Sequence, residues 1–321
     1  MRICRSFCSC LSLLALSFPA YAAGCDEDDL AECSSVHAVP PVAAAVGYNK
    51  NTFSTNAFST SSVDMRGTYA SGFQWYLFNF FGSAPTAAHI TINGDKSITV
   101  GQGGNDYNAA LSSAAQIRRS PGYVGTAFGG GAYIEAVVKF DAQAFNGIGI
   151  GWPSFWTNAL ESNMGTSQWP GQAAGYHHSI EADILEYFQG QWSDPLNQYS
   201  ASLHDWYGPS GSGDQYAIGT AYTVPQADFS NYNTVAMLWV PATGTTDGHI
   251  NFYWNGNLVS TQSYTQLTDA DQPPPSASTP WAFGIIDQDH LVIETGSDNT
   301  YPITIQSVNV WQASANSNLH H

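Results

Sequence analysis

The sequence predicts an all-β sandwich, and three observations lead to that prediction. Short runs of β-forming residues recur along the chain, and Asn-Gly pairs separate some of them, as in β-hairpins. No segment keeps an apolar period of 3.6 residues over a dozen positions, as a core-facing helix would. Hydrophobic residues make up 43% and aromatic residues 13% of the chain, which supplies a large core and excludes a disordered chain.

The expected strands begin near residue 46 and continue to residue 311. Two hairpins are expected at Asn-Gly pairs, because this dipeptide favours the tight turn that joins antiparallel strands. The last expected strand alternates apolar and polar residues, which is typical of a half-buried strand. The hairpins are 89–92, Asn93-Gly94 and 97–100, and then 249–254, Asn255-Gly256 and 258–259, and the other clear strands are 133–140, 234–240 and 303–311.

The N-terminal residues have the pattern of a secretory signal peptide. Arg2 and Arg5 precede an apolar run over 6–18, and Ala20-Tyr21-Ala22 is a small-x-small cleavage site. The run is too short to span a bilayer, and no later segment is long enough, so we expect no transmembrane segment and a secreted or periplasmic protein. The expected parts are a signal peptide at 1–22, a tether at 23–45, one strand-rich domain at 46–313 and a tail at 314–321.

Two of the five cysteines remain after the signal peptide is removed. In an oxidising compartment Cys25 and Cys33 are expected to form a disulfide that closes a small loop in the tether. An alternative is a lipid anchor on Cys25, because Ala22-Ala23-Gly24-Cys25 is a loose lipobox. That alternative would leave Cys33 without a partner.

The charge balance narrows the possible partners. Eight basic residues face 25 acidic ones, for a net charge of −17 at pH 7, and no Lys/Arg cluster could neutralise phosphates. We therefore expect no nucleic acid partner and repulsion from an anionic membrane surface. A neutral or cationic partner fits this chain better.

One strand-like segment, 179–188, concentrates three of the acidic residues. Alternation places Glu181 and Asp183 on one face, with Ile180, Ala182 and Ile184 on the other. Glu186 would point to the wrong face in a regular strand, so we predict a bulge at Ile184-Leu185 that returns it to a concave sheet face. Such crowding raises at least one carboxyl pKa.

Three readings of this segment are open. It could be an acidic surface strand, or its carboxylates could bind a structural calcium, for which no ligand set can be assigned. The third reading is glycoside hydrolysis, which needs two suitably spaced carboxyl groups. The intact apolar face argues against a plain surface strand, and the spaced pair favours glycoside hydrolysis over calcium.

The segment resembles the Glu-x-Asp-x-x-Glu signature of glycoside hydrolase family 16, the laminarinase and agarase group. Further segments resemble other elements of that family, in the family's order, over roughly 46–312. Each segment alone is weak evidence for the resemblance, but all of them in the family's order are strong evidence. They are 131–140, Gly151-Trp-Pro-Ser-Phe-Trp156, Ser202-Leu-His204-Asp-Trp206, 238–242, 252–256 and 308–311.

The resemblance implies a jelly-roll sandwich of the concanavalin A-like lectin and glucanase type. It implies that Glu181 is the nucleophile and Glu186 the general acid/base, with Asp183 hydrogen-bonded to Glu181 and assisting it. The chain departs from the family pattern at Ala182, Val137 and Glu294, and these departures put the substrate in doubt. Glu294 stands where many members have Asn or Gly.

Aromatic and histidine side chains near the acidic segment are candidates for substrate binding. Sugar rings present apolar faces that stack on indoles, so Trp152, Trp156 and Trp206 are expected to contact substrate, whereas Trp311 is expected in the core. His204 shares a face with Trp206, and a purely structural role for it is equally open. His177-His178 has no third ligand at zinc spacing and is set aside.

The sequence therefore predicts an exported, retaining endo-β-glycosidase that hydrolyses a β-1,3-glucan or a related β-glucan or galactan. No cofactor is expected, and we expect a monomer whose partner is its polysaccharide substrate. Two alternatives stay open. A transglycosylase would use the same residues with a sugar acceptor, and a carbohydrate-binding sandwich would share the fold without catalysis.

Overall fold

The strands of this chain form two large sheets. Their arrangement is seen in a computed structural model, and residues 39–321 make up one compact unit. Among the described residues, no helix has both the length and the hydropathy needed to cross a membrane. The described residues are 38–80, 85–101, 109–117, 122–142, 152–163, 176–188, 196–209, 214–224, 229–241, 248–262, 290–297, 301–316 and 318–320.

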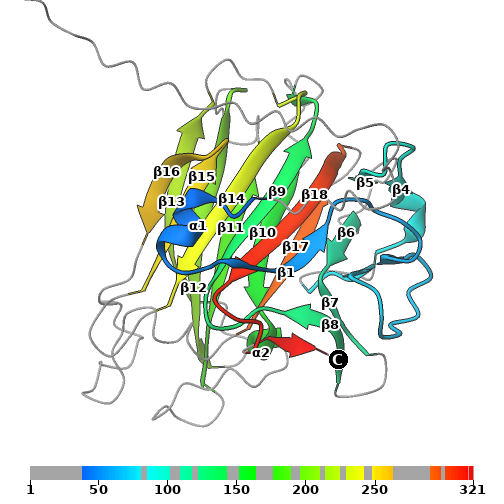
Figure 1. The fold of residues 1–321 in the computed structure, drawn as a ribbon, viewed down its shortest axis with the longest axis horizontal. Coiled ribbons are helices and arrows are strands. Elements are labelled where there is room, and N and C mark those ends of the chain that lie inside the picture. The colour runs from blue at the N-terminus through cyan, green and yellow to red at the C-terminus, as the bar shows by residue number, and fades with distance from the viewer. Residues whose placement is uncertain are drawn as a thin grey trace, which may run out of the picture. The chain divides into compact units, whose positions relative to one another are not determined.

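Sheet A contains both expected hairpins and the last long strand (Figure 1). All of its pairings are antiparallel, and β1 (Lys50–Thr55) adds to it by pairing with β18. Its order is β16 (Asn257–Gln262), β15 (His249–Trp254), β14 (Asn233–Val240), β9 (Ala132–Lys139), β18 (Ile303–Gln312), β5 (Ile98–Val100) and β4 (Ile90–Ile92).

Sheet B contains the acidic segment near its middle (Figure 1). It is antiparallel except for the short pairing of β2 with β3. Its order is β13 (Asp214–Thr223), β12 (Gln198–Pro209), β11 (Tyr176–Glu186), β10 (Ser154–Ala159), β17 (Leu291–Ser297), β6 (Ala109–Ser112), β3 (Trp75–Tyr76) and β2 (Val63–Asp64). A smaller sheet joins β19 (Leu319–His320), β8 (Tyr123–Ala127) and β7 (Ala114–Gln116).

The main core lies between the two large sheets. On β11 the inward residues are Ile180, Ala182 and Ile184, all at most 1% exposed, and they belong to one cluster with Ile134 and Val235 of sheet A. This alternation is what the sequence pattern indicated for the acidic segment. The prediction of an all-β jelly-roll sandwich of two antiparallel sheets is confirmed.

The two Asn-Gly turns differ in geometry. At the second, Asn255 and Gly256 both have positive φ, as a two-residue hairpin turn requires. At the first, Lys96 is the residue with positive φ, and the amide of Asn93 bonds to the carbonyl of Ser97. The first loop therefore closes at Asn93 and Ser97 and is longer than the dipeptide alone would suggest.

Both ends of the described unit pack onto the sandwich. The helix α1 (Pro41–Ala45) buries Ala43 fully, in a cluster with Tyr133 and Trp311 on the outer face of sheet A. At the other end, β19 pairs with β8. The packed unit thus starts near Val39, before the expected domain start at 46, and it includes residues of the expected tail. The other helical elements are η1 (Ala87–His89) and α2 (Leu160–Asn163).

The basic residues are confined to one part of the chain. Lys139, at the end of β9, is the last lysine or arginine in the sequence, and none occurs from 140 to 321. Strands β10 to β17, which include the centre of sheet B, therefore carry acidic residues and histidines but no permanent cation.

Candidate active site

The bulge predicted on β11 is present. Asp183 pairs with Trp156, but the next paired residue of β11 is Leu185, opposite Phe155, so Ile184 is the extra residue. The pairing with β12 shifts over the same stretch, between Asp183 and Glu186. Ile184 and Leu185 are both buried in the main core, so the strand gains one residue and Glu186 returns to the outer face.

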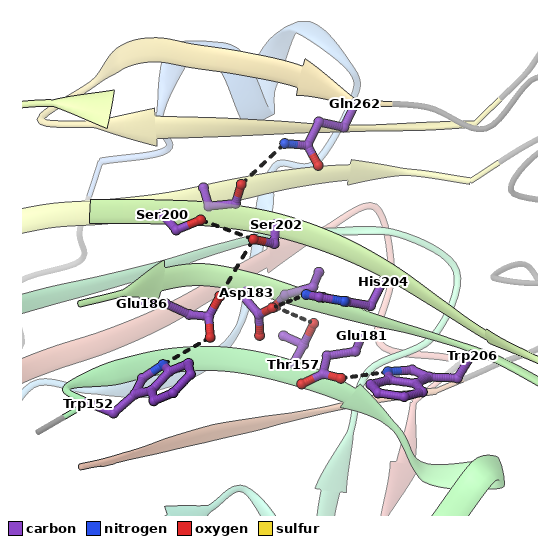
Figure 2. A network of polar contacts seen from close by, with 12 residues as sticks. Trp152, Thr157, Glu181, Asp183, Glu186, Ser200, Ser202, His204, Trp206 and Gln262 are labelled. Atoms are coloured by element: carbon purple, nitrogen blue, oxygen red, sulfur yellow. Dashed lines mark hydrogen bonds and ion pairs between the residues drawn. The ribbon is translucent and has the colours of Figure 1, made fainter. Parts of the chain in front are cut away.

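Indole N–H groups hold the two outer carboxyls of the segment. Trp206 on β12 donates from Nε1 to Glu181 Oε2 over 2.6 Å, and Trp152, just before β10, donates from Nε1 to Glu186 Oε1 over 3.0 Å (Figure 2). The Ser202 hydroxyl lies 3.5 Å from Glu186 Oε2. Glu181 and Glu186 are therefore oriented by donors from opposite sides of the cluster, as Figure 2 shows.

Asp183 lies between the two glutamates but has a different partner from the one expected. The sequence analysis expected a hydrogen bond to Glu181, whereas in the structure Asp183 Oδ2 lies 3.0 Å from His204 Nε2. Its other hydrogen bond is with Glu186, and its interaction with Glu181 is one of charge. Asp183 thus connects the two sides of the cluster, because Glu186 is the expected acid/base and His204 is the cross-strand partner of Glu181.

Burial raises the pKa of every carboxyl in this cluster, and charge repulsion adds to this for Glu181 and Asp183. The pKa of Glu181 is raised to about 8, chiefly by burial and then by the nearby Asp183 charge, while the Trp206 N–H opposes both. Burial also raises the pKa of Asp183 well above its usual range, and the Glu186 charge adds to this. The pKa of Glu186 is raised by burial, against the lowering effect of the Trp152 N–H. The cluster therefore retains protons at neutral pH.

Sequence reasoning missed Asn158 on this face and misjudged Glu294. Trp156 pairs with Asp183 on one side and with Glu294 of β17 on the other, while Asn158 pairs with Glu181. Glu294 is fully buried, its Oε1 accepts from the Phe80 N–H over 3.2 Å, and burial raises its pKa to about 8. The sequence analysis noted Glu294 only as a departure from a family pattern, and nothing local to it or to Asn158 indicates the pairing of β10 with β17.

The other predicted residues fall in three groups. His204 stacks on Trp206, with ring centroids 6.0 Å apart, so both lie at the cluster. Trp311 is buried, but under α1 on the outer face of sheet A rather than between the sheets. The remaining residues lie outside the described residues, at least in their side chains: Cys25, Cys33, His177 and His178.

One set of ligand atoms in this site could hold a metal ion. Asp183, Glu186 and His204 offer atoms that all lie within 4.8 Å of one another. An imidazole with two carboxylates suits zinc better than calcium, which prefers six to eight oxygen ligands. In the structure the same atoms contact one another and the Trp152 and Ser202 donors, which forms a hydrogen-bonded network.

The sheet order defines the fold as a two-sheet sandwich of the concanavalin A-like lectin and glucanase type. An endo-1,3-β-glucanase from Streptomyces sioyaensis is similar, with a TM-score of 0.50 and 16% identity over 85% of this chain and 97% of its own. Basic winged bean lectin has a TM-score of 0.37 at 11% identity, over 81% of this chain and 96% of the lectin. At these identities the likeness shows the fold alone. No protein-family model matches the chain, and no curated protein matches it.

Proposed function

We propose that this protein is an exported, retaining endo-β-glycosidase of the family 16 type, acting on a β-1,3-glucan or a related β-glucan or galactan. The observation that supports this most is the placement of Glu181 and Glu186. Both lie on one face of β11, and each is oriented by an indole N–H. Retaining glycosidases use two carboxyl groups about 5–5.5 Å apart, one as nucleophile and one as acid/base.

In the proposed first step Glu186 protonates the glycosidic oxygen while Glu181 attacks the anomeric carbon. The bond to the leaving sugar breaks, and a covalent glycosyl-enzyme forms on Glu181. In the second step Glu186, now ionised, takes a proton from water, and the resulting hydroxide equivalent displaces Glu181. The Trp206 N–H favours the ionised form of Glu181, as a nucleophile requires.

Asp183 has a proposed role in holding a proton for Glu186. It is buried, hydrogen-bonded to Glu186 and in contact with His204. Protonated Asp183 carries no charge, so Glu181 can ionise beside it more easily than beside a second anion. The assisting role expected from the sequence is therefore kept, with Glu186 as the group assisted directly.

The first test is release of reducing sugar from β-1,3-glucan, mixed-linkage glucan, agar and xyloglucan, measured in parallel with and without EDTA. We expect release from one of the first three, unaffected by EDTA because the proposed steps use no metal. Binding to one of these polysaccharides, with no release of reducing sugar from any of the four, would favour the carbohydrate-binding sandwich. Longer products in place of free reducing ends would favour a transglycosylase.

Matched variants then separate the two glutamates. Glu181→Ala removes the nucleophile, so hydrolysis of every substrate should fall at least about 1000-fold. Glu186→Ala should spare the first step on an activated aryl glycoside, and azide should restore turnover and give the β-glycosyl azide. Rescue of Glu181→Ala instead, with an α-azide product, would reverse the two roles.

A further inference from the structure

Three buried polar atoms beside Glu181 have no hydrogen-bond partner among the described residues. They are Trp156 Nε1, Asn158 Nδ2 and Glu294 Oε2. Trp156 Nε1 is close enough to the Glu294 carboxyl to lower its pKa, but the two do not form a hydrogen bond of acceptable geometry. Buried polar groups in native proteins nearly always have partners, so three together indicate that a bound molecule completes them.

The pairing of strands brings these three atoms to one place on the outer face of sheet B. Trp156 and Asn158 are two residues apart on β10 and so point to the same face. Glu294 is the cross-strand partner of Trp156 on β17, and its charge interacts with that of Glu181 on the far side of β10. Adjacent strands lie about 4.8 Å apart, so Asn158 is one strand spacing from Glu181 and Glu294 is two, about 9.6 Å across the sheet. The side chains and one sugar ring together can span that distance.

The chemistry of the set defines its ligand. It offers two N–H donors and one carboxyl oxygen, while the other oxygen of Glu294 is held by the Phe80 N–H. A hydroxyl group suits this arrangement, because it accepts from an N–H and donates to a carboxyl oxygen. An anionic group does not suit it, since the site-bearing strands contain no lysine or arginine to neutralise one.

We propose that Trp156, Asn158 and Glu294 form a subsite that recognises a free hydroxyl of the sugar unit bound at Glu181, and that Glu294 determines specificity there. The sugar hydroxyl would accept from Trp156 or Asn158 and donate to Glu294 Oε2. This inference rests on the proposed function, because it places the reacting sugar at Glu181. It adds to that function a requirement for an uncharged sugar with the matching hydroxyl free.

The test crosses enzyme variants with substrate analogues. The substrates are the aryl β-glycoside of the oligosaccharide that is cleaved best, and its derivatives lacking one hydroxyl of the aryl-bearing sugar. Wild type should lose about 10-fold to 100-fold in kcat/KM on one deoxy derivative. On the parent substrate, kcat/KM of Glu294→Ala should be lower than that of wild type by a similar factor. Removing the same hydroxyl from the substrate should not lower the kcat/KM of Glu294→Ala any further, because the substitution and the deoxy derivative remove the same hydrogen bond.

Two further variants separate recognition from folding. Glu294→Gln keeps nearly the same shape, but its single oxygen accepts from the Phe80 N–H, so an NH2 donor takes the place of Oε2 and the variant should lose the discrimination as Glu294→Ala does. Val292→Ala, on the same strand and face, removes buried volume without a polar atom and should discriminate like wild type. The inference is overturned if, for every deoxy derivative, kcat/KM relative to the parent substrate falls by the same factor in Glu294→Ala and Glu294→Gln as in wild type. In that case the unpaired atoms bind water only.

Calorimetric binding of the same oligosaccharides distinguishes this inference from the proposed function. Binding that depends on Glu294, without any hydrolysis, would refute the glycosidase and leave the subsite standing. Hydrolysis with no dependence on Glu294 for any hydroxyl would refute the subsite and leave the glycosidase standing.

Discussion

Two tryptophan N–H groups favour the ionised forms of the two proposed catalytic carboxyls. The Trp206 N–H lowers the pKa of Glu181, and the Trp152 N–H lowers the pKa of Glu186. Trp206→Phe should therefore raise the pKa of Glu181 and move the acid limb of kcat/KM to higher pH, since the nucleophile must be ionised. Trp152→Phe should raise the pKa of Glu186 and move the alkaline limb to higher pH, since the acid must be protonated.

Each Phe variant is the control for the other, because both remove one indole N–H from the same face. We expect kcat/KM at the optimum to fall about 10-fold in each, the effect of one hydrogen bond to a charged group. The measurement is kcat/KM against pH for wild type and both variants. Movement of the same limb in both would contradict the separate roles of Glu181 and Glu186.

Glu294 should make the folded state less stable as the pH rises. Its folded pKa is about 8, against about 4.3 for an unfolded glutamate. Below the lower value both states are protonated, and between the two only the folded state keeps the proton, so stability falls with rising pH. Glu294→Gln should therefore be more stable than wild type by about 1–3 kcal/mol at pH 7, and the difference should shrink towards pH 5.

Urea unfolding of both proteins from pH 5 to pH 8 measures this difference. Parallel stability curves would show that Glu294 does not titrate between its unfolded and folded values. Because the substitution keeps the side-chain shape and the acceptor for the Phe80 N–H, any difference reports the proton rather than packing.

For single residues, the sequence predicted the site side chains that lie in one continuous segment. It missed side chains that come together only through the pairing of strands. Glu181, Asp183 and Glu186 follow from alternation and a bulge within six residues. Asn158 reaches the site because β10 pairs with β11, and Glu294 reaches it because β17 pairs with β10, more than 130 positions away in sequence. The partner of Asp183 was also missed, since a neighbouring histidine on β12 competes with the glutamate two residues before it.

The bulge in β11 can be tested by deletions, because side chains along a strand alternate between the two faces of the sheet. Deleting Ile184 leaves Leu185 facing inward and Glu186 facing outward, because regular alternation then replaces the bulge. This variant should keep its fold and some hydrolysis, within about 100-fold of wild type. Deleting both Ile184 and Leu185 turns Glu186 into the core, so hydrolysis should fall more than about 1000-fold and folding should suffer.

The two deletions are compared by reducing-sugar release and by thermal unfolding followed by circular dichroism. The single deletion is the control for shortening the strand. Equal loss of activity in both, with both proteins folded, would show that Glu186 does not need the outer face.

Among the elements, the sequence indicated β9, β11, β14, β18 and both hairpins, but it did not indicate β13 or β17. It missed α1, whose five residues are too few for a helical period to be visible, and which is held by packing on Tyr133 and Trp311. It also left out β19, which depends on pairing with β8 and on the Asn318 side chain that contacts Gln312. Both elements form through contacts with distant residues rather than through local propensity.

The charge of the whole molecule should govern which glycans can approach. The chain has a net charge of −17, and the strands that carry the site have no lysine or arginine. Hydrolysis of a sulfated galactan should therefore be weak at low salt and increase several-fold at 0.5 M salt, because salt screens the repulsion. Hydrolysis of a neutral glucan should change little.

The desulfated form of the same galactan is the matched control, because it keeps the linkages and loses the charge. Initial rates on both polymers over a series of salt concentrations give the comparison. Faster hydrolysis of the sulfated form at low salt would contradict this reading of the charge distribution.

The absence of lysine and arginine after Lys139 also has a consequence for proteolytic mapping. Trypsin has no cleavage position between residue 140 and the end of the chain, so both proposed catalytic glutamates stay on one tryptic fragment of 182 residues. A sugar trapped on Glu181 would change the mass of that fragment without revealing which glutamate carries it. A protease that cleaves before aspartate would cut between Ala182 and Asp183 and place Glu181 and Glu186 on different peptides.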